Sequence, residues 1–319
     1  MAIQSEQGKA FEFACLNAIY EMLASPQYTV NLVIDSPFRT ARNAFSLLDD
    51  QKQNNLVLAG RAGARVLMRA EPRLSCISPN EQLTLQIQTD AAGIRGDVRD
   101  ILCIKSNLSW SIGISCKHNH AAVKHSRLSQ TINFGNEWFG FSCSQNYFSQ
   151  ISPIFSYLDN LRHQGALWSS IEDKESSVYI PILKAFIEEL RRLSVDHPNL
   201  PELLVEYLIG NQDFYKIIAI DNLNSTRIQA FNFLGTLNQS YGSIKPSIRI
   251  PQLRLPTRFY NIDFKKNSRT TIEVVFDNGW QISLRIHNAS SRVEPSLKFD
   301  VQLISTPHEV FYHDEPWIV

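Results

Sequence analysis

Residues 100–117 have the sequence DILCIKSNLSWSIGISCK, and this stretch predicts the centre of the fold. Strand-forming residues fill 100–105 and 109–117, while Ser106 and Asn107 between them favour a turn. Side chains on a strand point alternately to its two faces. The stretch therefore predicts a β-hairpin. Its second strand has a bulky core face, made by Trp110, Ile112, Ile114 and Cys116, and a small polar face, made by Ser111, Gly113, Ser115 and Lys117.

A carboxylate and a lysine lie at the mouth of this hairpin. Asp100 begins the first strand, ahead of the apolar run 101–104, and Lys117 ends the polar face of the second. Nucleases of the PD-(D/E)xK type are built in this way. Their carboxylate holds Mg²⁺ against the scissile phosphate, and their lysine orients the attacking water. A surface hairpin with both side chains merely solvated has the same spacing, so that alternative stays open.

The N-terminal segment contributes a second carboxylate. Residues 8–24 have helical periodicity up to Pro26, with a broad apolar arc along one side. Glu12 falls inside this arc, whereas Glu6 and Glu21 lie outside it or at its edge. A carboxylate that faces a core needs a cation or a hydrogen-bonding partner. Glu12 is therefore either part of the active site or half of a buried salt bridge with an arginine.

The charges of the chain are unevenly distributed, although its formal net charge is zero. A neutral chain by itself gives no sign of a nucleic-acid partner. However, residues 95–128 carry six Lys and Arg against two acids, and residues 245–292 carry nine against three. Residues 152–225 carry eleven acids against six bases. Two basic segments flank an acidic middle, so a basic groove that binds phosphates remains an alternative.

The five cysteines are widely spaced and include no CxxC pair, which is typical of reduced core residues. No basic stretch followed by an apolar one opens the chain, and no apolar run approaches the length of a membrane span. We therefore expect a globular cytoplasmic protein with no membrane partner.

The run HNH at residues 118–120 raises the alternative of an HNH nuclease or a zinc site. No cysteine or second histidine pair lies at zinc-finger spacing, so contact with the substrate is the better interpretation. We expect residues 120–130 to be helical, which would let Lys124 and Arg127 reach phosphates beside the active site. A solvated basic helix face is the alternative.

The remainder of the chain changes character twice. Pro181 and Pro201 each open a helix, and residues 214–220 form a short buried strand. Further on, residues 270–276 and 280–287 form two strands joined across Asp-Asn-Gly, a strong hairpin signal. We therefore expect an α/β fold with three parts: a core that carries the hairpin at 1–150, a helical region at 151–235 and a β-rich region at 236–319.

Two groups of motifs far apart in the chain carry a family resemblance. The first group is GDVRDI (96–101), IGISCKHNH (112–120) and VKHSRLS (123–129), and the second is NGW (278–280), SLRIHNASS (283–291) and EPSLKFD (294–300). Both resemble the HaeIII family of type II restriction endonucleases, and together they frame most of the chain. The resemblance implies a prokaryotic PD-(D/E)xK nuclease that cuts GGCC to blunt ends with Mg²⁺. A companion cytosine methyltransferase would protect the host.

Carried over residue by residue, the resemblance implies three catalytic residues: Asp100, Lys117 and Glu12. One position departs from the pattern, because the acid expected two residues before the lysine is Ser115 here. A hydroxyl is a poorer Mg²⁺ ligand than a carboxylate. Asp100 would therefore bind the metal with an additional oxygen from Glu12 or Asp97.

The target implied by the resemblance also suggests DNA contacts. Guanine is usually read in the major groove by Arg or Lys, and a basic segment near the C-terminus offers such a side chain. The resemblance thus implies a catalytic core at 1–150 and a DNA-recognition region at 236–319. DNA-binding residues are expected in two groups: His118, Asn119, Lys124 and Arg127 near the active site, and Arg285, His287 and Asn288 in the DNA-recognition region.

Three questions stay open at this point. A palindromic target favours a homodimer with two-fold symmetry, but a monomer that cuts one strand at a time would also serve. A DNA-repair or junction nuclease with the same core is a second function. A non-catalytic DNA-binding protein with a decayed active site is a third, because Ser115 replaces an acid.

Overall fold

The computed structural model describes residues 2–24, 29–76, 78, 81–89, 97–119 and 126–318. The chain is mixed α/β, as expected, and it divides into two compact units assembled from separate segments. Unit 1 comprises Met1–Ala121, Asn211–Leu253 and His308–Val319, and unit 2 comprises Ala122–Gly210 and Arg254–Pro307. Within the described ranges, no helix combines the length and the apolar character that crossing a bilayer requires.

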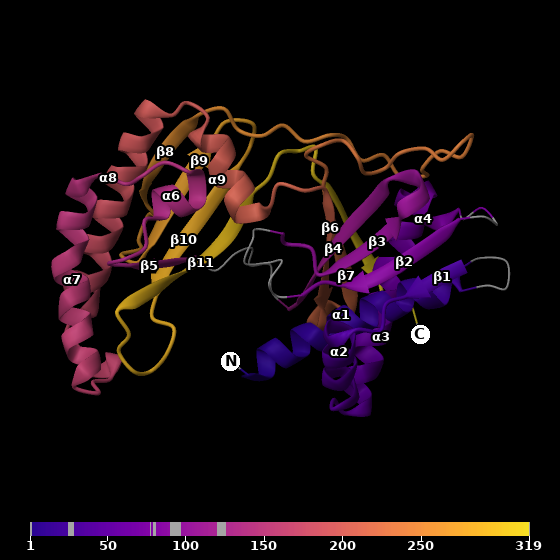
Figure 1. The fold of residues 1–319 in the computed structure, drawn as a ribbon, viewed down its shortest axis with the longest axis horizontal. Coiled ribbons are helices and arrows are strands. Elements are labelled where there is room, and N and C mark those ends of the chain that lie inside the picture. Colours follow the sequence, from indigo (N-terminus) through magenta and orange to yellow (C-terminus); the bar gives the residue numbers. More distant parts are fainter. Residues whose placement is uncertain are drawn as a thin grey trace. The chain divides into compact units, whose positions relative to one another are not determined.

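Unit 1 is built on a seven-stranded sheet with the order β1-β2-β3-β4-β6-β7-β12 (Figure 1). Neighbouring strands are antiparallel except for the β1–β2 and β4–β6 pairs, which are parallel. The described helices, turns and strands of this unit are α1 (Ala2–Leu23), β1 (Thr29–Leu32), α2 (Ser36–Ser46), α3 (Asp50–Ala70), α4 (Pro72–Ser75), β2 (Gln82–Ile87), β3 (Ile101–Lys105), η1 (Ser106–Leu108), β4 (Trp110–His118), β6 (Phe214–Ile220), η4 (Asp221–Leu223), β7 (Ser225–Phe231) and β12 (Phe311–Pro316).

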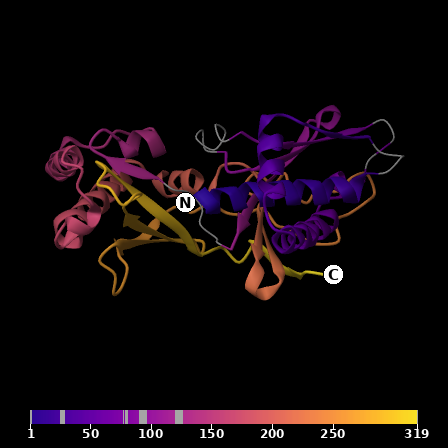
Figure 2. The same ribbon diagram turned by 90° about the horizontal axis from the view of Figure 1, so that it is seen from below.

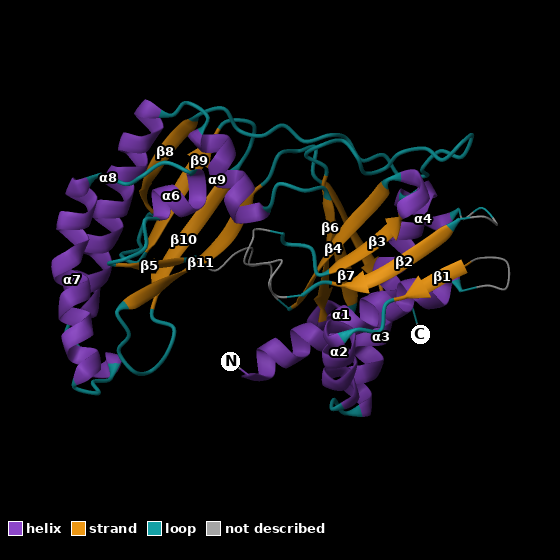
Figure 3. Ribbon diagram, in the orientation of Figure 1, coloured by secondary structure: helices purple, strands orange, loops and turns teal. Residues whose placement is uncertain are grey.

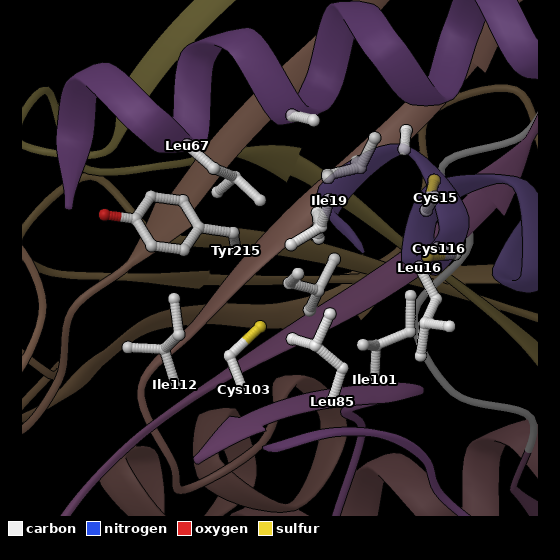
Figure 4. Close-up of a cluster of buried hydrophobic side chains, with 14 of the residues drawn as sticks. Cys15, Leu16, Ile19, Leu67, Leu85, Ile101, Cys103, Ile112, Cys116 and Tyr215 are labelled. Carbon is white, nitrogen blue, oxygen red and sulfur yellow. The ribbon is translucent and has the colours of Figure 1, made fainter. Parts of the chain in front are cut away.

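The main core of unit 1 lies between this sheet and the helices α1 and α3, which contact each other and cover one face of the sheet (Figure 2). The hairpin expected at residues 100–117 is confirmed as β3 and β4, joined by the short turn η1. Ile112, Ile114 and Cys116 point into the core, as the alternation predicts. Cys116 contacts Cys15 of α1 in this cluster, part of which Figure 4 shows. The opposite face of β4 is thereby left to carry polar side chains.

A buried carboxyl group closes one end of this core. The Glu71 side chain has no solvent exposure, and its Oε1 accepts hydrogen bonds from the Tyr215 hydroxyl and the Asn238 N–H, both over 2.6 Å. Burial raises the pKa of Glu71 to about 7, although these two hydrogen bonds favour the ionised form. The folded protein therefore retains a proton here that the unfolded chain, with its lower carboxyl pKa, has already released.

This difference in pKa predicts how stability changes with pH. Between the unfolded and folded pKa values the folded state binds more protons, so the free energy of unfolding should fall as pH rises from about 5 to about 7. Glu71→Gln should flatten this slope, because an amide cannot titrate. Urea denaturation at a series of pH values measures it, with the exposed Glu202→Gln as a control. An unchanged slope in Glu71→Gln would show that Glu71 does not hold this proton.

Unit 2 packs its helices against a five-stranded antiparallel sheet with the order β5-β11-β10-β9-β8 (Figure 3). Aromatic side chains fill much of its core, with Phe186 lying 5.1 Å from Phe299 and 5.6 Å from Trp138 between ring centroids. The described elements of this unit are β5 (Arg127–Ser129), α6 (Phe134–Phe139), α7 (Gln145–His163), η2 (Trp168–Ser170), η3 (Glu175–Tyr179), α8 (Ile180–Asp196), α9 (Leu200–Ile209), β8 (Phe259–Phe264), β9 (Thr271–Phe276), β10 (Gln281–His287) and β11 (Ser296–Ser305).

Two expectations about the organisation differ from the structure. The helix expected at 120–130 is wrong in its second half, because β5 is a strand that pairs with residues 296–298 of β11. Residues 120–125 lie outside the described part of the chain. The units also cross the expected boundaries at 150 and 235. The strands β6 and β7 join the sheet beside β4, and β12 joins it beside β7. The segments Asn211–Leu253 and His308–Val319 therefore belong to unit 1.

Candidate active site

Asp100 lies directly before β3 and is held by β4. Its backbone N–H donates to the Ile114 carbonyl over 2.7 Å, which extends the β3–β4 ladder by one residue. Its side-chain Oδ2 accepts hydrogen bonds from Ser115 Oγ (3.2 Å), the Cys116 N–H (2.6 Å) and Lys117 Nζ (3.4 Å). The carboxylate is therefore fixed on the polar side of β4.

Lys117 and Asp100 form an ion pair that solvent can reach. Nζ and Oδ2 lie 3.4 Å apart, and the two side chains are 22% and 24% exposed. The alternative of a surface hairpin is wrong, because β3 and β4 lie in the middle of the seven-stranded sheet. The structure thus places an ammonium group and a carboxylate together at the end of the hairpin opposite its turn.

Glu12 approaches this pair from α1. The residue is 7% exposed, so the expectation that it faces the interior is confirmed. Its Oε2 lies 3.2 Å from Lys9 Nζ, so its charged partner is a lysine rather than the arginine considered above. Burial, with a further contribution from the negative charge of Asp100, raises the pKa of Glu12 to about 7. The positive charges of Lys9 and Lys117 oppose this rise.

These two carboxylates are the side chains that fit the expected Mg²⁺. Among the described residues, no group of three or more His, Cys, Asp or Glu side chains forms a ready metal cluster. Glu12 and Asp100 are nevertheless close enough for the negative charge of Asp100 to raise the pKa of Glu12. A divalent cation between them would relieve this repulsion. Mg²⁺ usually binds through one or two carboxylates and completes its shell with water and substrate phosphate, so the donor set fits.

Asp97 is engaged elsewhere. Its Oδ1 accepts a hydrogen bond from Arg99 Nε and its Oδ2 one from Arg99 Nη2, both over 2.8 Å, and Gln88 Nε2 donates to Oδ2 over 3.0 Å. Burial by itself would raise the pKa of Asp97, but these hydrogen bonds outweigh it and lower the pKa. Because both oxygens already have partners, the geometry favours Glu12 over Asp97 as the second metal ligand.

Gly113 makes room for this arrangement. A Cβ atom at position 113 would lie 1.9 Å from Cδ of Arg99 and 2.3 Å from its Cγ, so the arginine lies directly across the glycine. Only a residue without a side chain lets Arg99 reach Asp97 over β4. The small polar face that the alternation predicts is therefore small for a packing reason at this position.

Replacing Gly113 with alanine should consequently displace Arg99. We expect a loss of about 1–3 kcal/mol in the free energy of unfolding, typical of overpacking, together with slower turnover of any substrate bound at Asp100. Urea denaturation measures the first effect. Gly8→Ala is the matched control, because nothing lies within 4 Å of a Cβ at that position of α1. If Gly113→Ala were as stable as Gly8→Ala, Arg99 would have an equally good alternative position.

Lys216 is an ionisable residue near the site that is not among those predicted from the sequence. It lies on β6, opposite Ser115 in the parallel β4–β6 pair, and is 3% exposed. Burial and the positive charge of Lys117 lower the pKa of Lys216 to about 7, against the opposing charge of Asp100. The signal available in the sequence was a single lysine inside the apolar run FYKIIAI (214–220).

His118 and Asn119 form a polar cluster with Asp221 at the end of β4. His118 Nε2 lies 3.0 Å from Asp221 Oδ2, and Asn119 Nδ2 donates to the same oxygen over 2.8 Å. The Asp221 N–H donates back to Asn119 Oδ1 over 3.0 Å. His118 and Asp221 also line a pocket with Gln7 and Lys52. The cluster joins the ends of β4 and β6, next to Lys117.

The other expected DNA contacts lie in unit 2 or outside the described residues. Lys124 lies outside them. Arg127 lies on a strand instead of a helix, and its Nη1 donates to Ser296 Oγ over 2.8 Å. Arg285 on β10 is 58% exposed and pairs with Asp300 over 3.3 Å. These two arginines belong to one sheet, in which β11 separates β5 from β10.

His287 and Asn288 are held by contacts within unit 2. His287 Nδ1 lies 2.9 Å from the Asn288 carbonyl oxygen. The Asn288 side chain accepts a hydrogen bond from the Tyr179 hydroxyl (3.1 Å) and donates one to the Ser290 carbonyl (2.7 Å). Arg285 is therefore the best placed of these three residues to contact a ligand directly.

The amino-acid sequence is also similar to those of known proteins. The family model described as HaeIII restriction endonuclease matches residues 8–307. The type II restriction enzyme HaeIII of Haemophilus aegyptius is 42% identical over 314 residues, which cover 98% of each chain. No solved structure matches. The matched residues include every residue of the candidate site, from Glu12 to Lys216. The chain therefore belongs to the HaeIII restriction endonuclease family.

Proposed function

We propose that this protein is a type II restriction endonuclease with a PD-(D/E)xK-type core. It would hydrolyse phosphodiester bonds of double-stranded DNA at the palindrome GGCC and leave blunt ends, with Mg²⁺ as cofactor. The observation that carries this proposal is the Asp100–Lys117 ion pair at the mouth of a central hairpin, with Glu12 beside it, in a chain of this family.

Each side chain of the site has a distinct role in this reaction. When bound by Asp100 and Glu12, Mg²⁺ supplies a Lewis acid for the scissile phosphate. Lys117 donates a hydrogen bond to the attacking water and orients it for in-line displacement of the 3′-oxygen. Asp100 keeps its orientation because Ser115 Oγ and the Cys116 N–H both donate to its Oδ2. Preorganised charge of this kind needs little rearrangement during the reaction.

The departure at Ser115 has a role in this scheme. Its hydroxyl lies 3.2 Å from Asp100 Oδ2 and is buried, so it positions the metal-binding carboxylate instead of binding metal itself. Glu12 then supplies the oxygen that the acid before the lysine would otherwise contribute. A site that retains two carboxylates and the lysine argues against a decayed, non-catalytic protein.

Digestion of a plasmid of known sequence tests the proposal. We expect fragments with blunt ends between the G and C of every GGCC site with Mg²⁺, and no cleavage with EDTA. Mapping the ends separates this function from a repair or junction nuclease, which would cut by DNA shape and not by sequence. Binding of DNA without any cleavage in Mg²⁺ would instead show that the site is inactive.

The palindromic target also bears on assembly. A homodimer that matches the two-fold symmetry of GGCC would cut both strands from equivalent sites. Light scattering with a GGCC duplex and Ca²⁺, which blocks cleavage, should then give the mass of two chains per duplex. One chain per duplex would indicate a monomer that cuts each strand in turn.

The enzyme would act in the cytoplasm of a prokaryote, on DNA lacking the protective methylation.

Arg127 and Arg285 should contribute to DNA binding in different ways. A lost phosphate contact weakens binding to all sequences and reduces the salt slope by about 0.9, because fewer counterions are released. We expect this for Arg127→Ala and for Lys124→Ala. A lost guanine contact relaxes discrimination by roughly 1–3 kcal/mol at one base pair. We expect this for Arg285→Ala, whose guanidinium is exposed.

Binding to GGCC and to single-mismatch duplexes across a salt series, with Ca²⁺ in place of Mg²⁺, measures both effects. Arg162→Ala, which removes an exposed arginine paired within α7, is the control. If Arg285→Ala lost affinity equally for matched and mismatched DNA, the C-terminal segment would hold DNA without reading it.

A further inference from the structure

Three basic side chains stand side by side across the sheet of unit 2. Arg127 of β5 is paired with Lys298 of β11, and Lys298 is paired on its other side with His287 of β10. Paired residues on adjacent strands project to the same face of a sheet. The three side chains therefore form a single line across three strands, the basic row.

The basic row lies on the face of this sheet opposite the aromatic core. Phe299, the next residue of β11, is buried in that core, where its ring lies 5.1 Å from the ring of Phe186. Lys298 points the other way, because side chains alternate along a strand. Arg127 is exposed, and Lys298 and His287 are half-buried. Solvent therefore reaches all three side chains.

The acids closest to the basic row already have arginine partners. Glu294 lies 3.7 Å from Arg127. Asp300 lies 3.3 Å from Arg285, which projects from β10 to the same face. The side chain of Lys298, in the middle of the row, makes no hydrogen bond or ion pair with another residue that the structure describes. Its charge is therefore available to a ligand.

The basic row is unfavourable for the sheet of the free protein. Like charges that lie directly opposite each other on neighbouring strands destabilise a sheet, and Lys298 has a basic residue on both sides. A glutamine at position 298 would occupy the same place without this repulsion. An anion bound over the row would remove the repulsion and gain from all three side chains. The arrangement therefore indicates a surface that binds an anion.

The phosphate backbone of DNA fits this surface. Neighbouring strands lie about 4.8 Å apart, so the basic row spans about 10 Å. One DNA strand carries a phosphate for about every 3.4 Å of helix axis, so a row of this length reaches at least two phosphates. The ring of His287 is also held in place, because its Nδ1 donates to the Asn288 carbonyl oxygen over 2.9 Å. Its Nε2 is the nitrogen that is left for a phosphate.

We propose that the basic row binds the phosphate backbone of the substrate DNA, with Lys298 as its central contact. This inference rests on the proposed function and extends it. It adds Lys298 to the residues that bind DNA, and it assigns the polar face of the unit 2 sheet to the backbone. Contacts with phosphates set the position of a protein on DNA but carry no sequence information.

Binding of Lys298→Gln to DNA across a salt series tests the proposal. The variant removes the charge and keeps a polar side chain. With Ca²⁺ to block cleavage, we expect it to bind a GGCC duplex and a duplex without GGCC at least about threefold more weakly at low salt. The slope of log affinity against log salt should become shallower by about 0.9 for both duplexes, because fewer counterions are released. Lys298→Arg, which keeps the charge, should bind like the wild type.

Urea denaturation of the free protein separates this role from a structural one. At low salt, the midpoint of Lys298→Gln should be at least as high as that of the wild type, because the substitution relieves repulsion within the basic row. Damage to the sheet would lower the midpoint. Weaker DNA binding by a variant that is at least as stable as the wild type is therefore a result that damage does not produce.

Lys184→Gln is the matched control. Lys184 is an exposed lysine on α8 of the same unit. Its substitution removes an equal charge from unit 2 and leaves the basic row intact. The affinity for both duplexes and the salt slope should therefore stay at the wild-type values.

Four results would overturn the inference. The first is a wild-type affinity and salt slope in Lys298→Gln, and the second is a loss confined to the GGCC duplex, which would make Lys298 a base-reading residue. The third is an equal loss in Lys184→Gln, which would make the effect one of overall charge. The fourth is a urea midpoint of Lys298→Gln below that of the wild type. A wild-type protein that binds neither duplex would contradict the proposed function as well, whereas these four results contradict this inference alone.

Discussion

Lys117→Ala and Asp100→Asn should each cleave GGCC DNA on the order of 10³-fold more slowly than the wild type, while still folding and binding DNA in Ca²⁺. The alanine lacks the ammonium group that orients the attacking water. The amide of Asp100→Asn keeps the size of the carboxylate but not the charge that holds the metal. Because the two groups lie 3.4 Å apart and act on one reaction, the double variant should be little slower than either single variant.

Single-turnover cleavage with saturating enzyme measures this loss without a contribution from product release. Ser111→Ala is the control, because Ser111 is exposed on the same face of β4 but lies away from Asp100 in the β3–β4 register. It should cleave at the wild-type rate. Near wild-type cleavage by either Lys117→Ala or Asp100→Asn would mean that the hairpin pair is not the active site.

Glu12→Gln should lose most of the cleavage activity, by about 10²–10³-fold, and should also bind Ca²⁺ more weakly. The reason is that Glu12 is the second carboxylate near Asp100, whereas both oxygens of Asp97 already accept hydrogen bonds. Ser115→Ala should stay within about tenfold of wild type, because a neutral hydrogen bond contributes modestly. Asp100 Oδ2 would retain the Cys116 N–H and Lys117 Nζ as donors.

Comparing these two variants by cleavage rate and Ca²⁺ titration identifies the second ligand. A Glu12→Gln enzyme that cuts well would make Glu12 a structural residue paired with Lys9, and Asp97→Asn would then be the variant to test. A Ser115→Ala enzyme as slow as Glu12→Gln would show that the hydroxyl takes a direct part in the site.

Several features of the site were predictable because they depend on local patterns. The two strands and their faces follow from the alternation of side chains over residues 100–117, and a short turn leaves few registers open. The contact between Asp100 and Lys117 follows from that register. The inward direction of Glu12 follows from helical periodicity, which needs only the neighbouring turns of α1.

Other features depended on pairing between distant segments. Lys216 lies about a hundred positions beyond Ser115 in the sequence, and only the parallel pairing of β6 with β4 brings them together. The helix predicted for residues 120–130 fails at Arg127 for the same reason. Arg127 lies on a strand because β11, far along the chain, supplies the hydrogen-bonding partner.

Local sequence patterns were enough for the hairpin and for the direction of Glu12, and the two sets of motifs were enough for the family. Pairing between distant segments brings β6 and β12 back to the sheet of unit 1, joins β5 to unit 2 and places Lys216 beside Ser115. The difference lies in the range of each signal. Side-chain periodicity is set within a few residues, whereas the choice of a strand's neighbour depends on which segments of the whole chain can bury their apolar faces together.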